Sequence, residues 1–144
     1  MIEYKENVLT YDIYTDLRQS VGWINFSPDQ TRLALTHSLL DITVWDNTRP
    51  IAMGRIIGDG LYDTIVDVIV HPQYQGQGIG RTIMEKLLLY GDINTPDGGR
   101  TSIQLIAEKG KEAFYQKLGF KLIPHEYCGS GMRKIIYKEM RSQS

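Results

Sequence analysis

The segment most suited to chemistry is the glycine-rich run QGQGIGR, from Gln75 to Arg81, which joins an apolar run to an amphipathic segment. Backbone N–H groups at the N-terminus of a helix lack partners within the helix, and the helix dipole adds about half a positive charge there. Glycine permits positive φ and close approach of the backbone to a ligand. The run therefore predicts a site for an anion, most commonly a phosphate.

Three phosphate-binding motifs compete for this run. A Walker A loop requires G-x-x-x-x-G-K-[ST], and neither that spacing nor its lysine is present. A Rossmann turn fits Gly76 and Gly78 but meets Arg81 where its third glycine belongs, and the strands expected before it are antiparallel. The third pattern, Q/R-x-x-G-x-G/A, is matched by Gln75, Gly78 and Gly80 and follows Val-x-Pro at residues 70–72.

A second motif lies at residues 113–120, AFYQKLGF, where Tyr115 is followed after three residues by Gly-Phe. With these two motifs in this order, the chain resembles the GCN5-related N-acetyltransferase (GNAT) superfamily over nearly its whole length. The resemblance implies the GNAT acyl-CoA N-acyltransferase fold, acetyl-CoA as cosubstrate, no metal, and a primary amine of a small molecule as acceptor.

By this resemblance, the backbone of the glycine run holds the CoA pyrophosphate, and the preceding strand pairs with the pantetheine arm as if it were another strand. The side chains of Gln77 and Arg81 are candidates to help, although a solvated arginine is the alternative. The expected cofactor-binding residues are Val68, Ile69, Val70, Gln75, Gly76, Gln77, Gly78, Ile79, Gly80 and Arg81.

Tyr115 matches the family tyrosine that protonates the departing thiolate. Its phenol, with an ordinary pKa of about 10, suits a donor to a thiolate. The alternative is a core aromatic beside Phe114. Many family members have asparagine seven residues before this tyrosine, and Glu108 stands there instead, which places the usual contact with the pantetheine arm in doubt.

Asp67 is a carboxylate in an otherwise apolar run, where burial is costly unless it has partners or a task. It is the candidate general base, and a hydrogen-bonded structural aspartate is the alternative. His71, before a proline, is expected to be structural. Because Cys128 has no sequence-adjacent activating partner, we expect direct transfer without a covalent enzyme intermediate; His125 and Glu126 are expected at the surface.

The acceptor is not fixed by the sequence. Aromatic side chains could line a pocket for an arylalkylamine, and carboxylates could attract a cationic amine, although core packing and solvation explain both sets equally well. A protein lysine or N-terminal acetyltransferase and a non-catalytic acetyl-CoA sensor are the alternative functions. The aromatic residues are Tyr11, Tyr14, Trp23, Phe26, Trp45 and Tyr127, and the carboxylates are Asp12, Asp16, Asp29 and Asp59.

Apolar periodicity and turn signals predict a mixed, mostly antiparallel sheet flanked by helices, in the α/β (α+β) class. The Ser27-Pro28 pair, with Gln30 three residues after the serine, predicts a helix start. Strands are expected at 2–5, 40–46, 51–58, 62–71, 102–107, 120–123 and 133–138; helices are expected around 13–21 and at 28–37, 79–88 and 111–118, with a loop at 92–100.

Composition limits the class of protein. A chain of 144 residues suits one domain, expected at 1–140 with a frayed tail at 141–144. A net charge of −1 argues against a nucleic-acid partner, and the charged N-terminus argues against a signal peptide or membrane anchor. One cysteine permits no internal disulfide and no zinc cluster, so a cytoplasmic protein is expected. A homodimer is left open.

Overall fold

The computed structural model describes residues 1–140, and its contacts divide the chain into two compact units. The first unit is Met1–Ile106 and the second begins at Ala107. The single domain expected at 1–140 stays a prediction, and the tail expected at 141–144 lies outside the described residues. Among the described residues, no helix combines the length and hydropathy needed to cross a bilayer.

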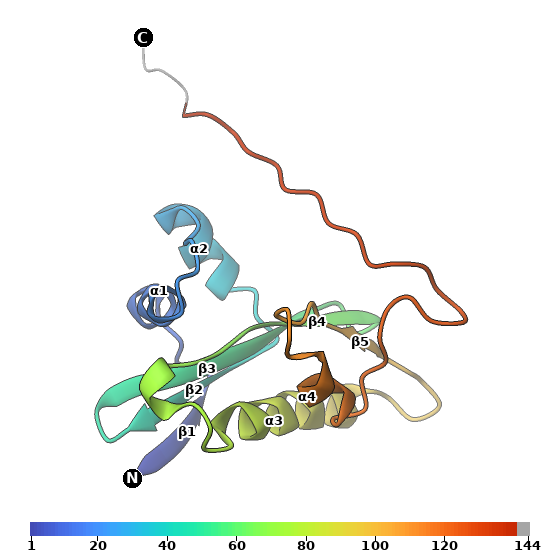
Figure 1. The fold of residues 1–144 in the computed structure, drawn as a ribbon, viewed down its shortest axis with the longest axis horizontal. Helices are drawn as coiled ribbons and strands as arrows, with labels where there is room; N and C mark the ends of the chain where they lie inside the picture. The colour runs from blue at the N-terminus through green and yellow to red at the C-terminus, as the bar shows by residue number, and fades with distance from the viewer. Residues whose placement is uncertain (141–144) are drawn as a thin grey trace. The chain divides into compact units, whose positions relative to one another are not determined.

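The first unit contains a five-stranded sheet in the order β1-β2-β3-β4-β5 (Figure 1). The pairs from β1 to β4 are antiparallel, whereas β5 is parallel to β4. The predicted mixed, mostly antiparallel sheet flanked by helices is thereby confirmed. Its strands are β1 (Ile2–Glu6), β2 (Leu40–Asp46), β3 (Arg49–Gly58), β4 (Tyr62–Val70) and β5 (Ser102–Gln104).

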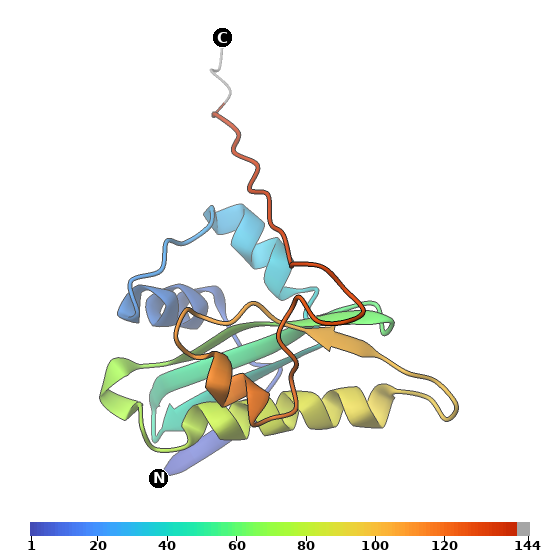
Figure 2. The ribbon, with the colours of Figure 1, turned by 45° about the vertical axis from the view of Figure 1, so that its right-hand side comes forward.

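Helices cover both faces of this sheet. The helices α1 (Tyr11–Ser20) and α2 (Pro28–Leu35) lie on one face, and α3 (Ile79–Asn94) lies on the other (Figures 1 and 2). Thr10 caps α1 by accepting a hydrogen bond from the Ile13 amide, and Pro28 begins α2 as predicted. The helix α3 continues to Asn94, so it includes the first residues of the loop that was predicted at 92–100.

The sheet is buried against a helix on each side. On the α1 side, Tyr14 and Leu17 pack with Met53 and Ile69 in one cluster. On the α3 side, the buried helix residues are Ile79, Ile83, Met84, Leu87 and Gly91. Burying each large apolar side chain stabilises the fold by roughly 1.5–3 kcal/mol, so the two layers hold β3 and β4 firmly at the centre of the unit.

The second unit differs from the sequence expectation. Within residues 107–140 it contains one short helix, α4 (Glu112–Gln116), and a bridge between His125 and Cys128. The strands predicted at 120–123 and 133–138 were wrong for the described structure, which pairs neither segment. Apolar residues there are exposed, among them Leu122, Ile123, Ile135, Ile136 and Tyr137. A β-favouring pattern forms a strand only when another strand satisfies its backbone groups.

Candidate functional site

The glycine run forms a turn between β4 and α3, entered through a short 3₁₀ helix, η1 (Pro72–Tyr74). Gly76 and Gly78 both have φ +80°, in the left-handed region where other residues are strained. Gly78 is the N-cap residue of α3, and none of the described side chains caps this helix. The first-turn N–H groups of α3 therefore have no side-chain cap, and the anion site expected there stays a prediction.

Side chains at the turn hold its shape. The Gln75 side-chain amide donates a hydrogen bond to the Val70 carbonyl at 3.0 Å. The His71 ring accepts one from the Gln73 amide at 3.2 Å, while the His71 amide donates to the Ile51 carbonyl at 2.8 Å. These contacts give His71 the structural role expected of it. The Gln75 side chain is thereby engaged within the turn.

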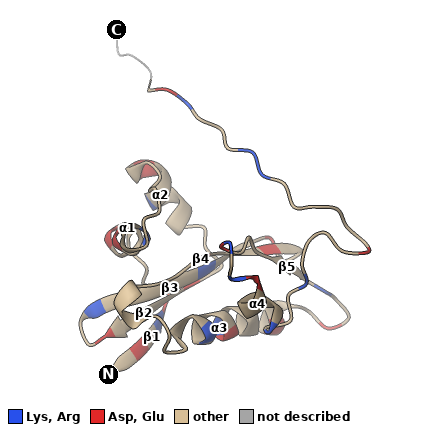
Figure 3. Ribbon diagram, in the orientation of Figure 1, with Lys and Arg blue, Asp and Glu red and all other residues tan. Residues whose placement is uncertain are grey.

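Arg81 lies on the first turn of α3. Its Nε is 2.9 Å from Oε1 of Glu85, and the two side chains are 64% and 56% exposed. Figure 3 shows basic and acidic residues side by side on this helix. An exposed ion pair of this kind contributes about 0–1 kcal/mol and is easily exchanged for another partner.

One edge of β4 is incompletely paired. The ladder with β5 joins Tyr62 to Ser102 and ends at Thr64 with Gln104. Beyond Thr64, none of the described strands pairs with this edge of β4. Because Val68, Ile69 and Val70 follow, their main-chain groups are placed to pair with an extended ligand that approaches the glycine turn.

The other edge of β4 contains a bulge. Met53 of β3 pairs with Ile69 and Arg55 pairs with Val66, so two residues of β4 oppose the one residue Gly54. Asp67 lies in the bulge with φ +57°, a left-handed conformation. A bulge bends its strand and increases the local twist, so β4 changes course at Asp67.

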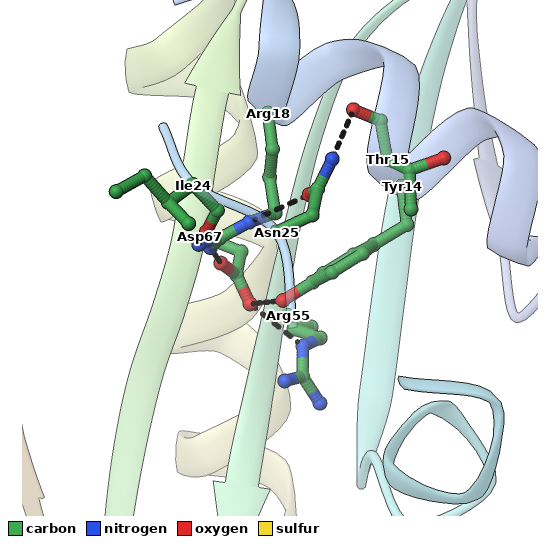
Figure 4. Close-up of polar contacts among 7 residues, drawn as sticks. All are labelled: Tyr14, Thr15, Arg18, Ile24, Asn25, Arg55 and Asp67. Atoms are coloured by element: carbon green, nitrogen blue, oxygen red, sulfur yellow. Dashed lines mark hydrogen bonds and ion pairs between the residues drawn. The ribbon is translucent and has the colours of Figure 1, made fainter. Parts of the chain in front are cut away.

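Figure 4 shows Asp67 between two arginines and a tyrosine. Arg18 of α1 donates from Nη1 to Oδ1 at 2.7 Å, and Arg55 of β3 donates from Nε to Oδ2 at 3.0 Å. The Tyr14 hydroxyl donates to Oδ2 at 2.9 Å. The side chains of Arg18 and Asp67 are only 10% and 7% exposed, so this ion pair is buried.

The arginines extend the network to the segment after α1 and to the loop between α2 and β2. Arg18 donates from Nη2 to the Ile24 carbonyl at 2.7 Å and from Nε to Oδ1 of Asn25 at 3.2 Å. Arg55 donates from Nη1 to the Ser38 hydroxyl at 3.2 Å. Burial, followed by the Asp67 charge, raises the pKa of Tyr14, so its phenol stays protonated and remains a donor at neutral pH.

These contacts separate the two roles considered for Asp67. A general base accepts a proton and becomes neutral. For Asp67, that would leave the buried guanidinium groups of Arg18 and Arg55 without their counter-ion, which is costly. The arrangement favours the structural alternative over the general base.

Tyr115 lies on α4, in the second unit. Its ring makes edge-to-face contacts with Phe114 at 5.0 Å and with Phe120 at 6.2 Å between centroids. Burial, and to a lesser extent the charge of Glu108, raises the pKa of Tyr115. The phenol is therefore protonated at neutral pH, the state that a proton donor requires.

Several candidate acceptor residues are engaged elsewhere. Tyr14 is buried in the α1 core, and the Trp45 indole donates to the Thr43 hydroxyl at 2.8 Å. Asp59 accepts hydrogen bonds from the Leu61 and Tyr62 amides, which lower its pKa. These three residues have structural tasks, whereas Phe26, Tyr127, Asp12, Asp16 and Asp29 are exposed.

Sequence reasoning missed two sets of contacts. Arg18 and Arg55 were not singled out, although an arginine and an aspartate in adjacent apolar strands were a signal for the pair of Arg55 with Asp67. Cys128 does have a neighbour, because its Sγ lies 3.2 Å from Nε2 of His125, three residues away. Among residues 1–140, no three His, Cys, Asp or Glu side chains gather as a metal site.

Known proteins resemble this chain in sequence. The family described as "Acetyltransferase (GNAT) domain" matches residues 41–122. Serotonin N-acetyltransferase 2, chloroplastic, of Oryza sativa is 38% identical over 76% of this chain and 55% of its own length. Histone acetyltransferase TAP1 of Glycine max is 40% identical over 85% of this chain and 56% of its own length. The chain thus spans little more than half of either relative.

A solved structure extends the similarity to the fold. A probable acetyltransferase from methicillin-resistant Staphylococcus aureus superposes with a TM-score of 0.84 at 31% sequence identity. The match covers 95% of this chain and 100% of that protein. With the family match over residues 41–122, these similarities show that the chain belongs to the GNAT family of acetyltransferases.

Proposed function

We propose that the protein transfers the acetyl group of acetyl-CoA to a primary amine of a small molecule, by direct attack of the amine. The observation that carries this proposal is the unpaired edge of β4 beyond Thr64, which leads into the glycine turn at the start of α3. An extended arm followed by a pyrophosphate fits that arrangement, since a strand edge binds the first and a helix N-terminus binds the second.

The residues proposed to bind acetyl-CoA lie in three neighbouring parts of the first unit. Main-chain groups of Val68, Ile69 and Val70 pair with the pantetheine arm, and amides of the turn from Gln75 to Gly80 bind the pyrophosphate. The guanidinium of Arg81 exchanges its exposed partner Glu85 for a phosphate oxygen.

The chemistry divides between the bound thioester and this chain. Acetyl-CoA supplies an activated acetyl group when bound. Main-chain N–H groups of β4 polarise the carbonyl, because they are fixed donors directed at the developing negative charge. As the amine forms its bond to the acetyl carbon and the carbon–sulfur bond breaks, the departing sulfur takes up a proton, and Tyr115 is the proposed donor because it matches the tyrosine of the family motif. The amine loses its proton to solvent.

The name of the serotonin N-acetyltransferase relative favours an arylalkylamine among the small amines. Two alternative functions are a protein lysine or N-terminal acetyltransferase, which the name of the histone acetyltransferase relative favours, and an acetyl-CoA sensor. A non-catalytic acetyl-CoA sensor would keep the turn and lack turnover. The tyrosine retained at position 115, where the resemblance implies the proton donor, supports an enzyme over a sensor.

The test measures CoA release from acetyl-CoA with a panel of serotonin, an aliphatic diamine, a lysine-containing peptide and a peptide with a free N-terminus. We expect turnover with a small amine, and a rate lower by about 10²–10⁴-fold in Tyr115→Phe, the contribution typical of a positioned acid. Turnover with peptides alone would select the protein acetyltransferase. Saturable CoA binding without release on any acceptor would select the sensor.

A cytoplasmic location and a homodimer stay predictions. The relative from Oryza sativa is named as chloroplastic, which makes a plastid the alternative location to test. Imaging of the tagged full-length protein in its own cells distinguishes the two compartments. Light scattering of the purified protein determines whether it forms a dimer.

A further inference from the structure

We propose that Arg18, Arg55 and Asp67 act as positioning residues that fix the course of β4 and thereby the affinity for the pantetheine arm of CoA. This inference rests on the proposed binding of acetyl-CoA. None of the three side chains needs to touch the ligand, because each acts through the backbone of Asp67 and the residues that follow it.

The first step concerns the backbone of Asp67. Its φ of +57° lies in the left-handed region, which is unfavourable for a residue with a Cβ atom. Such a conformation persists where the surroundings over-determine it. Here the surroundings are the three donors on its carboxylate, which come from α1 and β3.

The second step concerns the choice of residue. Glycine would adopt this conformation without strain, so the bulge alone does not require an aspartate. Asp67 adds two anchored oxygens, with Oδ1 bound to Arg18 and Oδ2 bound to Arg55 and Tyr14. Two rigid guanidinium donors fix the carboxylate in one orientation. The bulge is therefore held at one geometry.

The third step connects the bulge to the ligand edge. Val68, Ile69 and Val70 follow Asp67 directly, and Ile69 resumes the ladder with Met53. The direction in which their main-chain groups point on the unpaired edge depends on the twist introduced at the bulge. The glycine turn has a separate anchor on β3, because the His71 amide donates to the Ile51 carbonyl.

This separation gives the inference a specific consequence. Loosening the Asp67 network should impair hydrogen bonding to the pantetheine arm while leaving the phosphate site of the turn intact. A general loss of stability would instead weaken the binding of the pantetheine arm and the binding of the phosphates together.

The test uses calorimetric titration of the purified full chain with CoA and, separately, with adenosine 3′,5′-bisphosphate, which keeps the 3′-phosphate and the first 5′-phosphate of CoA but lacks the second 5′-phosphate and the pantetheine arm. We expect Arg18→Lys and Asp67→Asn to weaken CoA binding about tenfold, the factor for one well-placed hydrogen bond. Affinity for the bisphosphate should stay within about twofold of the wild-type value by the same arithmetic. Circular dichroism identifies any variant that does not fold.

Two further variants sharpen the result. Arg32→Gln is the matched control, because Arg32 is an exposed arginine on α2 that pairs with Asp29 at 3.6 Å; it should bind CoA as the wild type does. Asp67→Gly keeps the left-handed backbone accessible but removes the anchors, so it should bind CoA weakly. If Asp67→Asn does not fold, Asp67→Gly still tests the role of the carboxylate.

The outcomes separate the two proposals. A wild-type chain that binds neither CoA nor the bisphosphate would contradict the proposed function. Wild-type binding with unchanged CoA affinity in Arg18→Lys and Asp67→Gly would overturn the positioning role alone. Equal weakening of CoA and bisphosphate would also overturn it, since that pattern is general destabilisation.

Discussion

Arg18 and Asp67 lie 49 residues apart in the chain, yet Nη1 of the arginine is 2.7 Å from Oδ1 of the aspartate. The pair joins α1, on one face of the sheet, to the bulge in β4 (Figure 4). Because both side chains are buried, their interaction is weakly screened by solvent and salt. It therefore couples the packing of the N-terminal helix to the shape of the strand that is proposed to bind the cosubstrate.

Replacing Arg18 by methionine should lower the free energy of unfolding by about 3–5 kcal/mol, the cost of breaking a buried ion pair by removing one partner. The reason is that Asp67 keeps its burial but loses the Arg18 donor, and Ile24 and Asn25 lose theirs. Urea unfolding followed by circular dichroism measures the change.

The control for this change is Glu85→Gln, which removes the exposed pair with Arg81 and should cost less than about 1 kcal/mol. A loss from Arg18→Met no greater than that of Glu85→Gln would show that the buried network contributes little to stability.

Gly54 should not tolerate even one added methyl group. A Cβ at Gly54 would lie 2.5 Å from Cγ2 of Ile83 and 3.3 Å from Cδ1 of Leu87, both on α3. Gly54→Ala should therefore force α3 away from the sheet and cost about 1–3 kcal/mol, as overpacked cores do. Thermal unfolding measures the loss.

Gly129→Ala is the matched control, because a Cβ there meets no atom within 4 Å. It should change the free energy of unfolding by less than about 0.5 kcal/mol. Similar melting temperatures for the two variants would show that α3 adjusts to the extra carbon without loss of packing.

Tyr14 should make the protein sensitive to alkaline pH. Burial, followed by the Asp67 charge, raises the pKa of Tyr14, whereas the unfolded phenol titrates near its usual value of about 10. Above that pH the unfolded chain loses a proton that the folded chain retains. The free energy of unfolding therefore falls as the pH rises from about 10 toward the folded pKa.

The experiment compares wild type with Tyr14→Phe by urea unfolding between neutral pH and the alkaline limit of stability. The variant should be less stable at neutral pH by about 1.5–3 kcal/mol, the value of a hydrogen bond to a charged group. Its decline above pH 10 should be shallower, although Tyr115 keeps part of the slope because its pKa is also raised. Parallel curves would contradict the role of Tyr14.

The first unit was largely predictable because its signals are local. The bounds of β2 were predicted without error, and those of β3 and β4 to within two residues, because runs of β-branched residues end at clear turns. The glycine turn was found because its backbone conformation requires glycine at Gly76 and Gly78. These features depend on residues that are close in sequence.

The buried network and the final strands were not predictable in the same way. Arg18 and Asp67 meet only because helix α1 crosses β4, and no local pattern reports a contact across 49 residues. The segments 120–123 and 133–138 have strand-like composition, but a strand also requires a partner, which the sequence does not identify. Sequence patterns therefore identify site residues whose role depends on neighbours in the chain, but they do not identify residues whose role depends on tertiary contacts.

The glycine turn allows the sharpest test of phosphate binding, because the chain contains a matched glycine elsewhere. Gly78 and Gly98 have φ of +80° and +78°, and a Cβ at either position meets no atom within 4 Å. The backbone strain caused by aspartate should therefore be similar at the two sites. Only Gly78 is the N-cap residue of α3, where a carboxylate would occupy the helix terminus and repel a phosphate.

Gly78→Asp should weaken CoA binding at least about tenfold, equivalent to 1.4 kcal/mol, and more so at low salt. Gly98→Asp should bind CoA as the wild type does. Calorimetric titration at two salt concentrations measures both, and equal CoA affinities for the two variants would exclude the turn as the phosphate site.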